Sequence, residues 1–287
     1  MTEHESRRIA ARGVRPRWRA FLLGCLVVGV ILSGLALRGL GDRWFFFPEV
    51  GVPVKPQDPG VQIDDVTFAA PGGPVLHGWW LRAEGSARGT VVYCHGNHAN
   101  RGHHFRFVQW LPRRGFDVLI FDYRGYGDSA GSPTREGLVD DTIAAIDLAL
   151  ARDPGRTVVF GHSLGGALGI VAAAARPAVR AVIAESTFAT YRAAARASMP
   201  ALGPLVPWLV SGGHDPVDAL ARIAPRPLLV VHGREDRITP LALGEELFAA
   251  AREPKSLHLV HRGGHVAAWV TEGAAFEERF CAFVDPK

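Results

Sequence analysis

The stretch VVFGHSLGGALGIVAAAA, from Val158 to Ala175, indicates how the whole chain folds. Its first residues are β-branched and aromatic, which is typical of a buried strand. Its last residues are mostly alanine, which favours a helix. Between the two lies Gly161-His-Ser-Leu-Gly165. The stretch therefore predicts a strand over 157–160, a sharp turn that carries Ser163, and a helix over 167–175.

The same alternation of apolar runs and helical patterns continues on both sides of this stretch. A periodic pattern over Arg135–Arg152 predicts a helix whose early acids, Glu136, Asp140 and Asp141, face solvent. The residues Pro71-Gly-Gly-Pro74 predict a hairpin turn. Strands are predicted over 65–69, 75–82, 90–94, 117–121, 157–160, 181–184, 227–231 and 256–260. This order predicts an α/β fold with a mostly parallel eight-stranded sheet and helices on both faces.

One segment interrupts the alternation. After Glu185, no strand is expected until residue 227, and the intervening chain is rich in proline and apolar residues. Loops this long are uncommon in compact domains unless they are functional. We therefore expect a small helical cap over about 188–215. An ordinary crossover helix with a long lead-in is the alternative.

Composition and charge indicate a single globular domain with no nucleic-acid partner. The chain has 287 residues, of which 48% are hydrophobic and 21% are charged, which suits one sizeable core. The net charge of +4 lies entirely in residues 1–19, where six arginines outweigh Glu3 and Glu5. The rest of the chain is balanced, which gives no sign of a nucleic-acid binder. The three cysteines lie far apart, and we expect no disulfide.

An apolar run follows the basic tail. Residues 20–37 carry no charge, and the run continues past Arg38 to residue 40, which is long enough to span a bilayer. We expect four segments: a cytoplasmic basic tail over 1–19, a transmembrane anchor over 20–40, a linker over 41–62, and a folded domain over 63–287.

A cleaved signal peptide and a lipoprotein signal are two other interpretations of the apolar run. A cleaved signal peptide normally has an apolar region of only about 7–15 residues. A lipoprotein signal would explain Leu22-Leu-Gly-Cys25, but here the long apolar run follows the cysteine. Six arginines precede the run and only Arg38 and Arg43 closely follow it, so the N-terminus is expected in the cytoplasm. The prediction is a single-pass membrane protein with its folded domain on the outer side.

The candidate catalytic residues follow from the turn at Ser163. The pattern Gly-x-Ser-x-Gly is weak alone, and the predicted strand–turn–helix context gives it weight. A serine nucleophile needs a histidine base and an acid that orients the base. Asp236 and His265 each follow a predicted strand, in the order serine, acid, histidine that this type of turn requires. Glu235 and His261 are the alternatives beside them.

Stabilising an oxyanion needs two backbone N–H groups. Leu164 is expected to supply one, because it directly follows the serine, and Asn97 is expected to supply the other from His95-Gly-Asn97. His95 is expected to stabilise that loop. More histidines follow in the loop, but their spacing matches no known zinc site. We expect no metal and no cofactor.

Several short strings complete the pattern: HGN, DYRGYGDSAGSPT, GHSLGG, ES, HGREDRITP and GGH. With the expected anchor, they resemble the α/β-hydrolase superfamily, and more narrowly its membrane-anchored serine hydrolase branch, over about residues 43–283. The resemblance implies a triad of Ser163, Asp236 and His265. It also implies that residues 122–134 form a structural loop beside the site. Similar proteins include acyl-protein thioesterases, lysophospholipases and serine-aminopeptidase-like proteins, so the substrate is not fixed.

The predicted function is a membrane-anchored serine hydrolase that cleaves ester or thioester bonds of small acyl or lipid-like molecules. Epoxide and haloalkane hydrolysis are disfavoured, because both need a carboxylate where Ser163 stands. An aminopeptidase-like amide hydrolase is an alternative that an acidic pocket would support. A non-catalytic, membrane-tethered binding protein is the alternative from another class, and the presence of all three triad candidates disfavours it.

Overall fold

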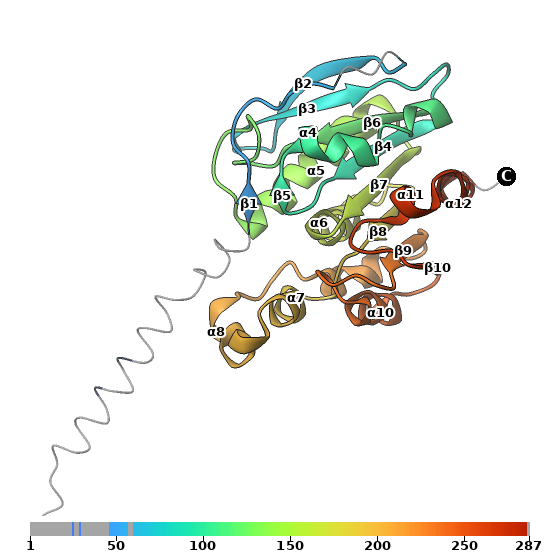
Figure 1. The fold of residues 1–287 in the computed structure, drawn as a ribbon. Helices are drawn as coiled ribbons and strands as arrows, with labels where there is room; N and C mark the ends of the chain where they lie inside the picture. The colour runs from blue at the N-terminus through green and yellow to red at the C-terminus, as the bar shows by residue number, and fades with distance from the viewer. Residues whose placement is uncertain (1–24, 26–28, 30–45, 57–59, 286–287) are drawn as a thin grey trace, which may run out of the picture.

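The computed structural model describes Cys25, Gly29 and residues 46–56 and 60–285 (Figure 1). The predicted basic tail lies outside these residues, as does the predicted anchor apart from Cys25 and Gly29. Among the helices within the described residues, none is long and apolar enough to cross a membrane.

An eight-stranded sheet forms the centre of the domain. Its strands are β2 (Ile63–Ala69), β3 (Val75–Leu81), β4 (Gly89–Cys94), β6 (Phe116–Phe121), β7 (Thr157–His162), β8 (Ala181–Glu185), β9 (Leu228–Gly233) and β10 (Lys255–Val260). They lie in the order β10-β9-β8-β7-β4-β6-β3-β2. The pairs from β10 to β6 are parallel, and β3 is antiparallel to both β6 and β2. The predicted α/β class and the mostly parallel sheet are confirmed.

Burial explains why the strands could be recognised in the sequence. Every residue of β4, β7, β8 and β9 is buried, as expected for parallel strands covered on both faces. Successive side chains enter opposite cores: Val159 joins one cluster, while Val158 and Phe160 join the other. Each of these strands therefore needs a continuous apolar run, because its side chains fill the cores on both faces of the sheet.

Helices cover both faces of the sheet. The helices α5 (Arg135–Arg152), α6 (Leu164–Ala174) and α10 (Leu241–Ala250) contribute to one cluster, and η1 (Phe105–Phe107) and α12 (Ala274–Val284) contribute to the other. The bounds of α5 match the predicted helix. Shorter turns fill the connections: α4 (Arg101–His104), η2 (Pro112–Arg114), α9 (Pro216–Ala219), η4 (Leu220–Arg222) and α11 (Ala268–Glu272).

The segment predicted as a cap contains α7 (Tyr191–Ser198), η3 (Pro200–Leu205) and α8 (Val206–Leu209). In Figure 1 these elements lie in yellow and orange at the lower left, beyond the carboxyl ends of the strands. Thr190 starts α7, because its Oγ1 accepts the N–H of Ala193 at 3.1 Å. Prolines at 200 and 204 keep the following turns short.

The prediction that Asp141 faces solvent is wrong. Asp141 is buried on α5, where its Oδ1 accepts a hydrogen bond from Arg124 Nη2 at 2.6 Å. The Arg124 backbone N–H also donates to Asp141 Oδ2, at 2.8 Å. Burial raises the pKa of this carboxyl, and Arg124 opposes the rise. Sequence periodicity did not reveal that the loop over 122–134 folds across the helix and supplies this partner.

A two-stranded parallel sheet, which the sequence did not predict, joins β1 (Phe47–Pro48) to β5 (His98–Ala99). The Glu49 N–H extends the pairing by donating to Ala99 O at 3.2 Å. Each strand has only two residues, too few to show a periodicity. The segment predicted as a linker thus includes a strand fixed to the loop after β4.

The turn between β7 and α6 brings three backbone segments into contact. A Cβ atom at Gly161 would collide with the carbonyl of Gly165, and one at Gly165 would collide with the carbonyl of Cys94 on β4. Both positions therefore need glycine for packing. This close approach sets the position of α6 and of the residue before it, Ser163.

Replacing Gly165 with alanine is expected to destabilise the domain by about 3 kcal/mol, which lowers the Tm of a domain of this size by about 6–12 °C. Gly203→Ala is the matched control, because a Cβ atom there meets nothing within 4 Å. Thermal unfolding of the purified full chain measures both variants. A Gly165→Ala protein that melts together with the wild type would contradict this account of the turn.

Candidate active site

Ser163 has a backbone conformation that residues other than glycine rarely adopt. Its φ is 52° and its ψ is −117°, which costs about 1–3 kcal/mol unless the surroundings compensate. The Ser163 N–H donates to Glu185 O at 2.8 Å, and Thr187 Oγ1 donates to Ser163 O at 2.7 Å. These bonds from the end of β8 hold the strained residue in place. The serine stands at the N-terminus of α6, in the strand–turn–helix context that the sequence predicted.

Asp236 and His265 lie next to each other beyond the ends of β9 and β10. His265 Nδ1 is 2.9 Å from Asp236 Oδ2. The other oxygen of Asp236 accepts the backbone N–H groups of Ile238 and Thr239, at 2.9 and 2.8 Å. The carboxylate is therefore fixed by its own loop while it holds the imidazole ring.

The surroundings of Asp236 keep it ionised. Burial alone raises the pKa of this carboxyl. The hydrogen bond and charge of His265, together with the two backbone N–H groups, outweigh burial and leave the pKa below its ordinary value. An ionised Asp236 accepts a hydrogen bond from Nδ1–H of His265, which leaves Nε2 of the ring without a proton and able to act as a base.

Two residues at the end of β8 hold the loop that carries His265. Ser186 Oγ accepts the N–H of Val266 at 3.0 Å, and Glu185 Oε1 accepts the N–H of Ala268 at 2.9 Å. Both side chains are buried. The two residues form the short string ES, and no feature of the sequence indicated what they contact. The loop that carries His265 follows β10, so these contacts reach past β9, which lies between β8 and β10 in the sheet.

His162, which precedes the serine, is buried beneath the turn. Its Nδ1 is 2.7 Å from Tyr93 Oη, and its Nε2 is 3.0 Å from Glu185 Oε2. The ring therefore contacts the same glutamate that holds the His265 loop. Through Glu185, the two sides of the candidate site share one buried contact network.

Four of the five predicted site residues line one cavity, and the fifth, Asp236, does not. Ser163, Leu164, Asn97 and His265 line one cavity of about 840 Å³, and Asp236 lies behind His265. Within the described part of the chain, no hydrogen bond joins Ser163 to His265. Apolar side chains from the cap, including Phe188, Ala194 and Met199, form one wall of the cavity.

Asn97 is held by residues far from it in sequence. Its side-chain Oδ1 accepts hydrogen bonds from Tyr126 Oη at 3.0 Å and from the Phe47 N–H at 3.3 Å. Tyr123 Oη donates to the carbonyl of His95 at 3.0 Å in the same loop. The loop over 122–134 and strand β1 therefore fix the position of the second predicted oxyanion donor.

The histidines near this loop have structural contacts. His95 Nδ1 lies 2.7 Å from Gly96 O, and its ring stacks on His104. Burial, followed by the influence of His95, lowers the pKa of His104 well below its ordinary value. Within the described ranges, no group of three or more His, Cys, Asp or Glu side chains is placed to hold a metal ion.

The alternative acid and base are both exposed. Glu235 and His261 are solvent-exposed, and neither lines the Ser163 cavity. The strand histidine His258 pairs with Glu272 instead, at 2.7 Å. The geometry thus favours Asp236 and His265 over their neighbours.

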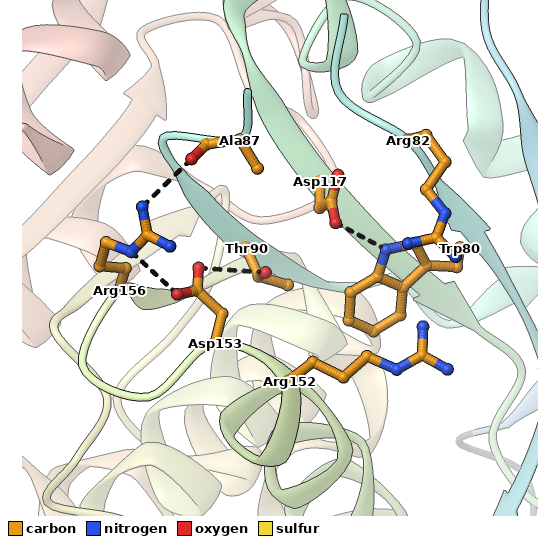
Figure 2. Close-up of a pocket in the computed structure, with 8 residues that line it drawn as sticks. All are labelled: Trp80, Arg82, Ala87, Thr90, Asp117, Arg152, Asp153 and Arg156. Atoms are coloured by element: carbon orange, nitrogen blue, oxygen red, sulfur yellow. Dashed lines mark hydrogen bonds and ion pairs between the residues drawn. The ribbon is translucent and has the colours of Figure 1, made fainter. Parts of the chain in front are cut away.

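A second hollow of about 430 Å³ lies at the opposite edge of the sheet (Figure 2). It opens where β4 and β6 begin, next to Thr90 and Asp117. Figure 2 shows Asp117 accepting the Trp80 indole N–H, at 2.9 Å, and Arg156 pairing with Asp153, also at 2.9 Å. Ligands of open α/β sheets bind at the carboxyl ends of the strands. The Ser163 cavity is therefore the candidate active site.

The fold and this geometry define a class of protein: the chain belongs to the α/β-hydrolase superfamily. The family described as serine aminopeptidase, S33, matches residues 85–226. That match includes Ser163 and ends before Asp236 and His265.

Particular relatives support the same class. The protein YfhR of Escherichia coli (strain K12) is 36% identical over 252 residues, which cover 84% of this chain and 86% of the relative. The α/β hydrolase domain-containing protein WAV2 of Arabidopsis thaliana is 28% identical over 283 residues, 90% of this chain and 92% of the relative. The esterase Pf2001 of Pyrococcus furiosus has the same fold, with a TM-score of 0.68 and 22% identity over 84% of this chain and 97% of the esterase.

The lowered pKa of Asp236 predicts a pH dependence of stability. A carboxyl whose pKa is lower in the folded protein stabilises the fold above its ordinary value of 3.8, and this contribution is lost as pH falls through the lower folded value. The free energy of unfolding should therefore fall more steeply between about pH 5 and pH 2 for the wild type than for Asp236→Asn. Urea unfolding at several pH values measures both slopes, and equal slopes would contradict the prediction.

Proposed function

We propose that the protein is a membrane-anchored serine hydrolase that cleaves ester or thioester bonds of acyl or lipid-like small molecules. One observation carries the proposal. A serine on a strained turn and a histidine bonded to a buried carboxylate line the same largely apolar cavity. Hydrolase is the coarse class that the family membership supports, and the triad and substrate are the finer part of the proposal.

The proposed reaction begins at Ser163. Nε2 of His265 takes the hydroxyl proton while Oγ attacks the substrate carbonyl carbon. The resulting oxyanion accepts hydrogen bonds from the backbone N–H groups of Leu164 and Asn97. Leu164 suits this role because the first N–H groups of a helix have no partner within it.

Collapse of the tetrahedral intermediate breaks the bond to the leaving group. Protonated His265 donates its proton to the departing alcohol or thiol, which leaves the acyl group on Ser163 Oγ. Water then attacks the acyl carbon while His265 takes one of its protons, and protonated His265 returns that proton to Ser163 Oγ as the bond to the acyl group breaks and the acid leaves. Asp236 keeps the imidazole in the required tautomer and stabilises its protonated form throughout.

The lining of the cavity favours acyl substrates over peptides with a free amino terminus. Recognition of an ammonium group calls for a nearby carboxylate. No Asp or Glu belongs to the described residues that line the cavity, whereas Arg106 does. Phe107, Phe188 and Met199 offer surfaces to an apolar chain instead.

The membrane part of the proposal rests on the sequence. Residues 20–40 are the proposed anchor, with the basic tail in the cytoplasm and the domain on the outer side. Such a tether would keep the cavity near lipid-derived substrates.

A fluorophosphonate probe tests the catalytic proposal. Wild type should be labelled covalently, because an activated serine attacks the phosphorus centre, and Ser163→Ala should show no labelling. Ser129→Ala is the matched control, since that hydroxyl is buried and donates to Asp122 O instead. Gel fluorescence reads all three proteins. The non-catalytic alternative would be favoured if wild type is not labelled, or if Ser163→Ala is labelled equally.

A panel of substrates tests the acyl preference. The value of kcat/KM for p-nitrophenyl esters should rise with chain length, by up to about tenfold for each pair of methylene groups that the cavity buries. Aminoacyl p-nitroanilides should be hydrolysed at least about 100-fold more slowly, since no carboxylate receives the ammonium group. A preference for aminoacyl substrates would instead support the aminopeptidase-like alternative.

A further inference from the structure

Exposed apolar side chains lie at the mouth of the Ser163 cavity, next to exposed polar lining residues such as Arg106 and Ser198. Three residues that line the cavity are also exposed: Phe47 by 59%, Met199 by 38% and Ile238 by 63%. They come from β1, from the cap and from the loop after β9. These three residues are referred to below as the apolar rim. Such side chains seldom gather at the surface unless something covers them.

Further exposed apolar residues lie on the segments that carry the rim. Val50, Val52 and Val54 follow Phe47 and are 77–87% exposed, and Leu205 follows Met199 on the cap and is 52% exposed. With the rim, they make seven of the nine large hydrophobic side chains exposed in the described part of the chain. The three valines line a third hollow, of about 340 Å³. His103 lines this hollow and also the Ser163 cavity, so the two surfaces adjoin.

Positive charges accompany this surface. Arg106 lines the cavity, Arg196 is on α7, and Arg237 precedes Ile238. All three are exposed, and none forms an ion pair with a described acid. The cap sequence over 188–214 contains no Asp or Glu. An apolar surface bordered by unpaired arginines is typical of proteins that lie on anionic lipid.

The chain also enters the domain at this surface. The proposed anchor ends at residue 40, and Phe47 follows within seven residues, a reach of at most about 25 Å. Pairing with β5 fixes β1 beside the cavity. Figure 1 shows β1 and the cap helices α7 and α8 toward one side of the domain, and α11 toward the other.

We propose that the apolar rim, the valines after it and Leu205 dock on a bilayer that contains anionic phospholipid. The cavity then opens into lipid, and an acyl substrate enters from the membrane without crossing water. The apolar side chains insert at the boundary between headgroups and acyl chains, and the arginines approach lipid phosphates. The proposal deepens the proposed function and rests on it for the anchor and the acyl substrate, but the docking needs no catalytic step.

The test uses the full chain in liposomes and a fluorophore that reports its surroundings. An NBD group is attached at Leu205→Cys, at Val54→Cys, or at the control Val270→Cys on α11, where the native side chain is 68% exposed. Cys25 and Cys281 are replaced by serine, and buried Cys94 is kept. The liposomes contain phosphatidylcholine with or without phosphatidylglycerol, and brominated lipid or aqueous iodide serves as quencher.

Docking predicts a blue shift at 205 and 54, quenching by brominated lipid, and protection from iodide. At position 270, the NBD emission should not shift, iodide should quench it, and brominated lipid should not. All three effects at 205 and 54 should weaken without phosphatidylglycerol and in salt of about 1 M, where charges are screened beyond about 3 Å. Quenching by iodide at all three positions would overturn the proposal. Protection from both quenchers would also overturn it, because it would mean that this chain's own residues or a second copy cover the surface.

An activity measurement separates this proposal from the proposed function. Arg196→Glu combined with Leu205→Glu should lower hydrolysis of a long-chain ester embedded in the bilayer about tenfold, while leaving hydrolysis of soluble p-nitrophenyl acetate within about twofold. Val270→Glu should change neither. Equal loss on both substrates would overturn docking as the cause. Absence of any hydrolysis by wild type, with fluorescence as expected, would count against the proposed function alone.

Discussion

The turn at Ser163 is the constraint on which the rest of the structure depends. It forces a serine into a left-handed conformation, and it requires two glycines where β4, β7 and α6 meet. The cost of this strain is offset by backbone bonds from β8 and by the buried packing of α6. As a result, the serine stands at the carboxyl edge of the sheet, at the N-terminus of α6 and in the wall of the cavity. The same turn therefore accounts for the backbone strain at Ser163 and for the place of this serine in the candidate site.

The other candidate site residues lie at the same edge of the sheet. Asn97, Ser163, Asp236 and His265 follow β4, β7, β9 and β10, and residues at the end of β8 hold the Ser163 turn and the His265 loop. Buried contacts between these loops limit their independent movement. Glu185 shows this best, because one carboxylate accepts from Ala268 and also lies beside His162. A change at that residue would reach both the turn and the histidine loop.

The sequence predicted features that local pattern encodes. The strands filled on both faces, helix α5 and the turn at Ser163 each have a signature within about 20 residues. Asp236 and His265 could be chosen because each follows a strand in a fixed order. The partners of Asn97, the pairing of β1 with β5 and the burial of Asp141 could not be predicted. They depend on contacts such as Tyr126–Asn97 and Phe47–His98, which join segments 29 to 51 residues apart and leave no periodic trace.

Strand β1 lies between the proposed anchor and the candidate site. Its Phe47 N–H donates to Asn97, and its Phe47 side chain forms part of the cavity mouth. The segment that follows the proposed anchor is thus hydrogen-bonded to the loop that would hold the oxyanion. If the anchor fixes β1 at the membrane surface, it also fixes the orientation of that loop and of the cavity beside it. Tethering would then orient the cavity as well as raise the local concentration of the domain at the membrane, because β1 follows the proposed anchor and contacts the candidate site.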